Sequence, residues 1–206
     1  MTFPEIDAFS REAERAERTL AAVDPDRWTG PGLGVWTLAE LTFHLVRQAD
    51  RLAAYHDRPV SAEQPALDRF AYCRGAAALS ADVAARARDG AAGIDPATLP
   101  AAFADAWRAS VAAASAPDAL IETVMGPMRT DEFTATRVLE VVVHHMDVRR
   151  CLDLPPDADP VAARLVTALL EGLLDGGRPR NLGRTRFILA ATGRTAVADP
   201  RFPVFG

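Results

Sequence analysis

The segment TDEFTATRVLEVVVHHMDVRRCL, residues 130–152, is an apolar run interrupted by polar residues at helical spacing. Each residue of an α-helix advances by about 100°, so side chains four positions apart point nearly the same way and lie about 6 Å apart. Glu140 and His144 therefore share one face of the predicted helix. An unpaired carboxylate in the core would cost several kcal/mol, and a bound cation would remove that cost. The segment predicts a helix that carries metal ligands inside the protein.

A second segment, WTLAELTFHLVRQAD, offers the further ligand that a divalent ion needs. Thr37 and Glu40 form a capping-box pattern, which predicts a helix from Thr37 to about His56. His44 lies beside the apolar stripe of this helix and is expected to point inward. A lone histidine in such a place is more often a core residue bonded to a backbone carbonyl. Two inward-facing helices together favour a metal site of His44, Glu140 and His144.

Other interpretations of these polar residues stay open. Glu140 can form a buried ion pair with Arg137 or His144 in place of binding a metal. Asp147 can hold the free imidazole nitrogen of His144 or pair with an arginine. His145 points about 100° away from His144, which indicates packing or support of the site rather than a ligand role.

Residues outside this cluster have weaker functional patterns. Arg137 and Arg194 are candidate anion anchors for a carboxylate substrate, with ordinary structural ion pairs as the alternative. His56 ends its helix, where a cation suits the helix dipole. Cys73 and Cys151 have no neighbour that would activate a thiol, so we interpret both as packing residues.

The remaining periodic segments predict an all-α chain. The pattern predicts further helices over Phe3 to about Asp24, Ala66 to Asp89, Ala101 to Ser115, Val161 to Leu174 and Arg184 to Thr192. IETVMGPM is typical of an extended connector, Thr130 is a candidate cap for the helix that follows, and DPRFPVFG resembles a docked strap. We expect an up-and-down four-helix bundle with additional short helices in one domain, 1–206, with the core bundle in about 1–155 and the added helices and tail in 156–206.

Composition excludes several classes of function. A net charge of -5 disfavours nucleic acid as a partner. All 23 basic residues are arginine, so a lysine Schiff base or lysine general base is excluded. The first residues lack the apolar core of a secretion signal, and no apolar stretch reaches the ~20 residues that cross a bilayer. With 2 cysteines and no CxxC pair, we expect a cytoplasmic protein without membrane contact.

WTLAELTFHLVRQADRL and the later FTATRVLEVVVHHMDVRR together resemble the DinB-like superfamily, in particular its mycothiol-dependent maleylpyruvate isomerase branch. The resemblance implies that His44, Glu140 and His144 bind a divalent metal, with zinc expected and nickel or iron as alternatives. It also implies a metal-dependent thiol transferase or thiol-assisted isomerase that uses mycothiol or a comparable thiol on a small electrophile, and a possible homodimer. The isomerase adds a small carboxy-terminal α/β domain, for which the residues after Gly193 are too few.

Two other functions remain open from the sequence. The same ion can activate water, which would make the protein a hydrolase that needs no thiol. The protein can also be a non-catalytic bundle that keeps the metal for structure.

Overall fold

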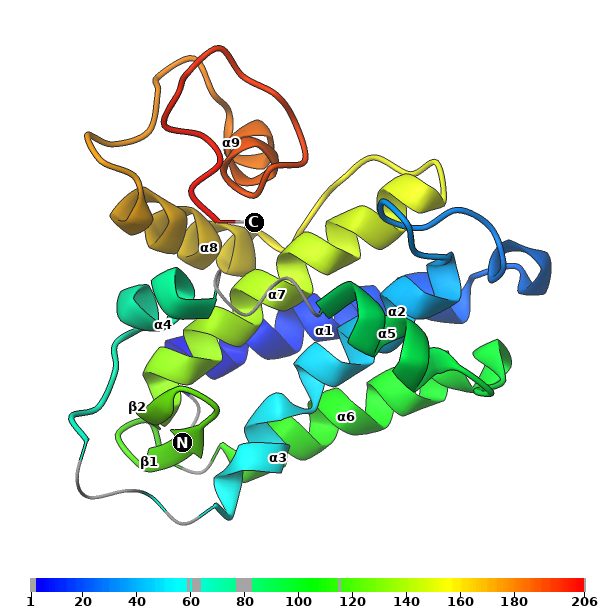
Figure 1. The fold of residues 1–206 in the computed structure, drawn as a ribbon, viewed down its shortest axis with the longest axis horizontal. Helices are drawn as coiled ribbons and strands as arrows, with labels where there is room; N and C mark the ends of the chain where they lie inside the picture. Colours follow the sequence, from blue (N-terminus) through cyan, green and yellow to red (C-terminus); the bar gives the residue numbers. More distant parts are fainter. Residues whose placement is uncertain (1–2, 59, 61–63, 77–82, 115, 206) are drawn as a thin grey trace.

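The computed structural model describes residues 3–58, 60, 64–76, 83–114 and 116–205. Within this part, four helical segments form a bundle: α1 (Pro4–Ala21), α2 (Leu38–Ala49) with its continuation α3 (Arg51–His56), α6 (Leu99–Ala113) and α7 (Thr130–Cys151). Both α7 and α6 pack against α1 and α2, so the four segments close a ring (Figure 1). The predicted all-α fold is confirmed.

Shorter elements cover the outside of this bundle. Helix α8 (Pro160–Leu173) packs on α1 and α7, and α9 (Arg184–Ala191) packs on α8. Two 3₁₀ turns, η1 (Pro25–Arg27) and η3 (Pro96–Thr98), precede α2 and α6. In the described part of the chain, no helix is both long enough and apolar enough to span a membrane.

The predicted helix from Ala66 to Asp89 is wrong as a single element. The structure has α4 (Arg69–Ala76) against α7 and α8, and α5 (Val83–Ala91) against α2. One straight helix could not contact both sides of the bundle. The positions between these two helices, 77–82, lie outside the described residues.

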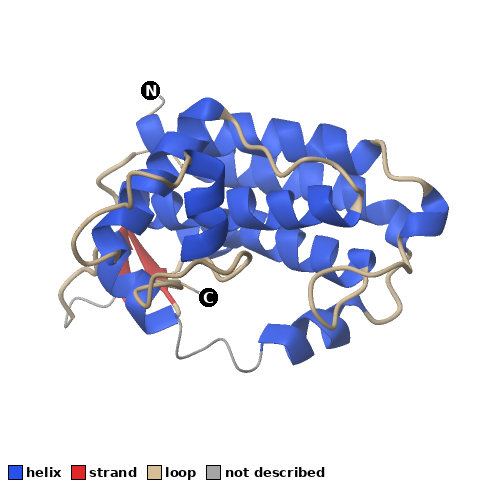
Figure 2. Ribbon diagram, turned by 90° about the horizontal axis from the view of Figure 1, so that it is seen from above, coloured by secondary structure: helices blue, strands red, loops and turns tan. Residues whose placement is uncertain are grey.

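The segment IETVMGPM, predicted as an extended connector, lies in two strands that pair with each other. Strands β1 (Leu120–Thr123) and β2 (Gly126–Arg129) form an antiparallel hairpin at one end of the bundle (Figures 1 and 2). The predicted capping role of Thr130 is wrong, because its hydroxyl donates to the carbonyl of Ala119, 3.0 Å away, and no side chain caps α7. The same threonine therefore fastens α7 to the residue before the hairpin.

The capping box that predicted the start of α2 is confirmed. Glu40 N donates to Thr37 Oγ1 over 3.2 Å, and Thr37 N donates to Glu40 Oε2 over 2.7 Å. The predicted single helix to His56 is divided at Asp50 into α2 and α3. Ser110 of α6 explains the division, since its hydroxyl donates to Ala49 O (2.6 Å) and accepts from Ala53 N (3.2 Å). A side chain inserted into the helical hydrogen-bond ladder bends a helix at that point.

Helix α7 is the central helix of the protein. Its buried residues include Phe133, Val138, Val141, Val142 and Val148, which face different directions around the helix axis. A helix that is apolar on all sides is suited to a fully enclosed position. Its polar residues are consequently buried as well and must find partners inside the protein.

One such group joins three helices. His145 of α7 is fully buried, with Nδ1 2.6 Å from Glu12 Oε1 and Nε2 2.8 Å from the Thr19 hydroxyl of α1. The other oxygen of Glu12 accepts from Asp159 N at the start of α8 over 2.6 Å. His145 lies in the contact of α7 with α1, which agrees with the predicted packing role.

We predict that Glu12→Ala lowers the free energy of unfolding by about 3–5 kcal/mol, because it leaves His145 and the Asp159 amide buried without their partner. Urea denaturation followed by circular dichroism measures this loss. Glu14→Ala, an exposed change on the same helix, is the matched control and should stay within about 0.5 kcal/mol of wild type. A loss below about 1 kcal/mol in Glu12→Ala would contradict the role of this network.

Candidate metal centre

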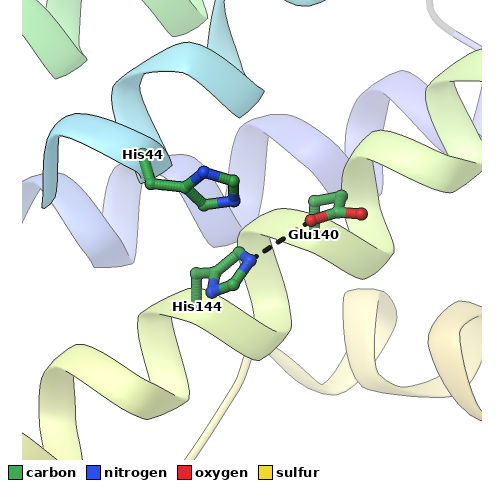
Figure 3. Close-up of side chains that lie close together, drawn as sticks. All are labelled: His44, Glu140 and His144. Carbon is green, nitrogen blue, oxygen red and sulfur yellow. Dashed lines mark ion pairs between the residues drawn. The ribbon is translucent and has the colours of Figure 1, made fainter. Parts of the chain in front are cut away.

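His44 of α2 and the pair Glu140 and His144 of α7 come together where the two helices pack. Each offers one ligand atom, and these atoms all lie within 4.8 Å of one another. The imidazoles of His44 and His144 meet edge to face, with ring centroids 4.6 Å apart. Figure 3 shows both rings and the carboxylate pointing toward a common centre. The structure thus brings together the three residues predicted as ligands.

One pair of ligand atoms in this group already has the separation that a divalent ion imposes, and the group as a whole lies within 4.8 Å. Two ligand atoms held about 2.0–2.1 Å from a tetrahedral ion lie about 3.3 Å from each other. Oε2 of Glu140 is 3.3 Å from Nε2 of His144, so these two side chains already have that separation. Two histidines and one carboxylate suit zinc, and a three-ligand set leaves a position for water or a substrate.

His44 has the protonation state of a ligand. The side-chain amide of Gln48 lies 3.0 Å from Nε2 of His44, and an amide NH₂ can only donate, so this nitrogen is the acceptor. Burial lowers the pKa of His44 to about 3, with the charge of His144 as the next cause. A neutral imidazole is the form that binds metals, and an ion at Nε2 of His44 would take the lone pair that here accepts from Gln48.

Glu140 is ionised in the same environment. Burial by itself would raise its pKa, but the contact with His144 and the charge of Arg137 outweigh burial and lower the pKa to about 2. For His144, burial opposes the charged form, but the carboxylates of Asp147 and Glu140 prevail and raise its pKa. The raised pKa favours the protonated form of His144, and binding of a metal ion at this ring would release that proton.

Asp147 combines the two roles that the sequence left open. Its Oδ2 is 3.3 Å from Nδ1 of His144, close enough for an ion pair but not aligned as a hydrogen bond. The same carboxylate accepts from Arg194, whose NH2 is 2.9 Å away. Arg194 also donates to Thr192 O over 2.6 Å. The structural alternative for Arg194 thus fits its position better than a free anion anchor.

Arg137 is likewise held within the protein. Its guanidinium donates to the Gln48 side-chain carbonyl and to the Thr136 hydroxyl, and it lies 4.8 Å from the centroid of the Phe133 ring. Gln48 therefore connects Arg137 to His44, a role that our sequence analysis missed. The signal was present, because Gln48 lies four residues after His44 on the same helical face.

The protein's own thiols are poor nucleophiles. Burial raises the pKa of Cys73 to about 12. The pKa of Cys151 is also raised, by burial first and then by the charge of Asp147. Both side chains remain protonated at neutral pH, which agrees with the packing role predicted for them. His56 is exposed at the end of α3, away from the ligand group.

The fold and the site together define a class of protein: a helical bundle that carries a cluster of two histidines and one carboxylate inside it. The model of the mycothiol maleylpyruvate isomerase N-terminal domain family matches residues 9–149. The chain belongs to this family, as the sequence resemblance predicted. No curated protein matches the chain.

Two solved structures share the fold. One is a mycothiol-dependent maleylpyruvate isomerase, with 15% identity, a TM-score of 0.62 and coverage of 95% of this chain and 93% of that chain. The other is a histidine-to-alanine mutant of the mycothiol-dependent maleylpyruvate isomerase, with 16% identity, a TM-score of 0.58 and coverage of 83% and 72%. The first alignment spans nearly all of that chain, whereas the second leaves more than a quarter of its partner unmatched.

We predict that protein purified without a histidine tag contains close to one equivalent of zinc, nickel or iron, because two histidines and one carboxylate that converge on one point are a typical ligand set of such an ion. His44→Ala and His144→Ala each remove one ligand and should lose most of the metal. Mass spectrometry of the metal content measures this. His56→Ala is the matched control and should retain the wild-type content, whereas equal metal in all four proteins would place the ion elsewhere.

Proposed function

We propose that this protein is a metal-dependent thiol transferase or thiol-assisted isomerase that activates mycothiol or a similar small thiol for attack on a small electrophile. The observation that supports this most directly is the convergence of His44, Glu140 and His144 at the contact of α2 with α7. Family membership supports the same chemistry. Zinc is the proposed ion, bound by these three residues within a single domain, 1–206.

A divalent ion, when bound, lowers the pKa of a coordinating thiol and so supplies thiolate at neutral pH. The residues of the chain prepare the site for that ligand. Glu140 contributes a full negative charge, and His44 is neutral. Asp147 lies 3.3 Å from the second ring nitrogen of His144 and is itself held by an ion pair with Arg194, so a carboxylate stays beside that imidazole.

The thiol must come from outside the protein. Cys73 and Cys151 are the only cysteines of the chain, and burial raises the pKa of both. A pocket of about 400 Å³ is lined by His44 and gives a small molecule access to the ligand group. Its volume suits a small electrophile, and maleylpyruvate, the substrate named for the family, is the first to test.

Action in the cytoplasm and assembly as a homodimer belong to the same proposal.

We predict that stoichiometric zinc-loaded protein lowers the apparent pKa of mycothiol from about 8.5 to about 7 or below. The rate of thiol alkylation by iodoacetamide as a function of pH measures this shift. His144→Ala should leave the thiol pKa unchanged, because the ion is absent. His56→Ala should reproduce the wild-type shift.

Turnover of maleylpyruvate with and without mycothiol separates the proposed function from its alternatives. Isomerisation that requires the thiol supports the proposal. Hydrolysis that proceeds equally without thiol would identify activated water as the nucleophile. Zinc-loaded protein that changes neither the thiol pKa nor any substrate would identify a structural ion in a non-catalytic bundle.

A further inference from the structure

The pocket beside His44 has two walls from different parts of the chain. One wall is a single face of α2 and α3, with Phe43, His44, Arg47, Gln48 and Arg51. The other wall is α5, which packs against α2. His44 belongs both to the lining of this pocket and to the candidate metal centre. A small molecule in the pocket can therefore reach one residue of the ligand group.

Helix α5 lies unusually close to α2 at this point. Gly90 of α5 faces the Phe43 ring, and a β-carbon at position 90 would fall 2.5 Å from Cε1 of that ring. Such a contact is too short for any larger residue without movement of the ring. The absence of a side chain at Gly90 thus lets α5 form the second wall and brings its charged residues to the pocket.

The pocket walls carry an excess of positive charge. Arg47 and Arg51 come from the α2 side and Arg86 from α5, against one carboxylate in the lining, that of Asp89. Arg47 pairs with Asp50 over 3.3 Å. Arg51 makes a long contact of 3.4 Å with the Tyr55 hydroxyl, which occupies one of the five N–H donors of its guanidinium. Arg86 also has an interaction partner, and the donors of the three guanidinium groups beyond these contacts can bind an anion in the pocket.

Two of these arginines follow His44 on the same wall of the pocket. Arg47 lies three residues after His44, about 4.5 Å along the axis of α2, and Arg51 is the first residue of α3. An anion bound by these side chains therefore lies in the same small pocket as His44. Guanidinium groups bind carboxylates through two parallel hydrogen bonds, which favours a planar carboxylate.

We propose that Arg47, Arg51 and Arg86 form a subsite that binds a carboxylate of a small organic acid and directs the rest of that molecule toward His44. The identity of this acid as the electrophilic substrate rests on the proposed function, whereas its binding by the arginines does not. The subsite selects substrates by charge at one end, while the ligand group acts at the other.

Maleate, an unreactive dicarboxylate, is the probe that tests the subsite. Calorimetric titration at fixed ionic strength should show that Arg51→Gln and Arg86→Gln each weaken maleate binding by about tenfold or more. Arg164→Gln, an exposed change on α8, is the matched control and should stay within about twofold of wild type. Arg51→Lys should give an intermediate loss, because lysine keeps the charge but not the paired hydrogen bonds.

Two further titrations decide what the arginines recognise. Maleamide has the shape of maleate without its charge and should bind at least about tenfold more weakly. Equal binding of maleamide, or unchanged maleate binding in both glutamine variants, would overturn the proposal. Inorganic phosphate that binds more tightly than maleate through the same arginines would overturn the assignment to carboxylates.

The His144→Ala variant separates this subsite from the metal centre. Maleate should bind this variant within about threefold of wild type, because His144 does not line the pocket. Loss of maleate binding in His144→Ala would show that maleate ligates the metal ion, and it would contradict the proposed arginine subsite. The protein can also bind maleate through the arginines and yet show no thiol-dependent activity. That result would support the subsite and contradict the proposed function.

Discussion

The enclosure of α7 is the constraint on which the rest of the structure depends. This helix is buried on every side, yet one stretch of it carries five charged or ionisable side chains: Arg137, Glu140, His144, His145 and Asp147. Each would cost several kcal/mol if it were buried without a partner. The surrounding elements supply those partners, and each contact also fixes an element against α7. Polar pairing inside the bundle thus determines both the packing around α7 and the geometry of the candidate metal centre.

The partners of α7 come from widely separated parts of the sequence. Glu12 of α1 holds His145, and the same carboxylate fixes the start of α8. Arg194, beyond α9, holds the Asp147 carboxylate that faces His144. The carboxy-terminal region is therefore connected to His144 through Asp147. Displacement of this region would release Asp147 and weaken its ion pair with His144.

Much of the fold was predictable because it follows local rules. The capping box at Thr37 located the start of α2, and the apolar run with polar interruptions located α7 to within a residue of its end. The inward direction of His44 followed from its place beside the leucine stripe. The division of α2 from α3 was not predictable, because it depends on Ser110 of another helix. The role of Thr130 was also missed, since its hydrogen bond goes to a distant carbonyl rather than to its own helix.

The sequence by itself determined which residues must be buried together, because a 3.6-residue period fixes the face of a helix that each side chain occupies. It therefore specified Glu140 and His144 as neighbours and named His44 as their inward-facing complement. Only the tertiary structure decided the distances among the three, the contact of Asp147 with Arg194, and the connection from Arg137 through Gln48 to His44. Only the tertiary structure also brought Arg86 of α5 and Arg51 of α3 into the lining of one pocket. Contacts between residues far apart in the chain depend on how the helices pack, and local periodicity carries no information about that packing.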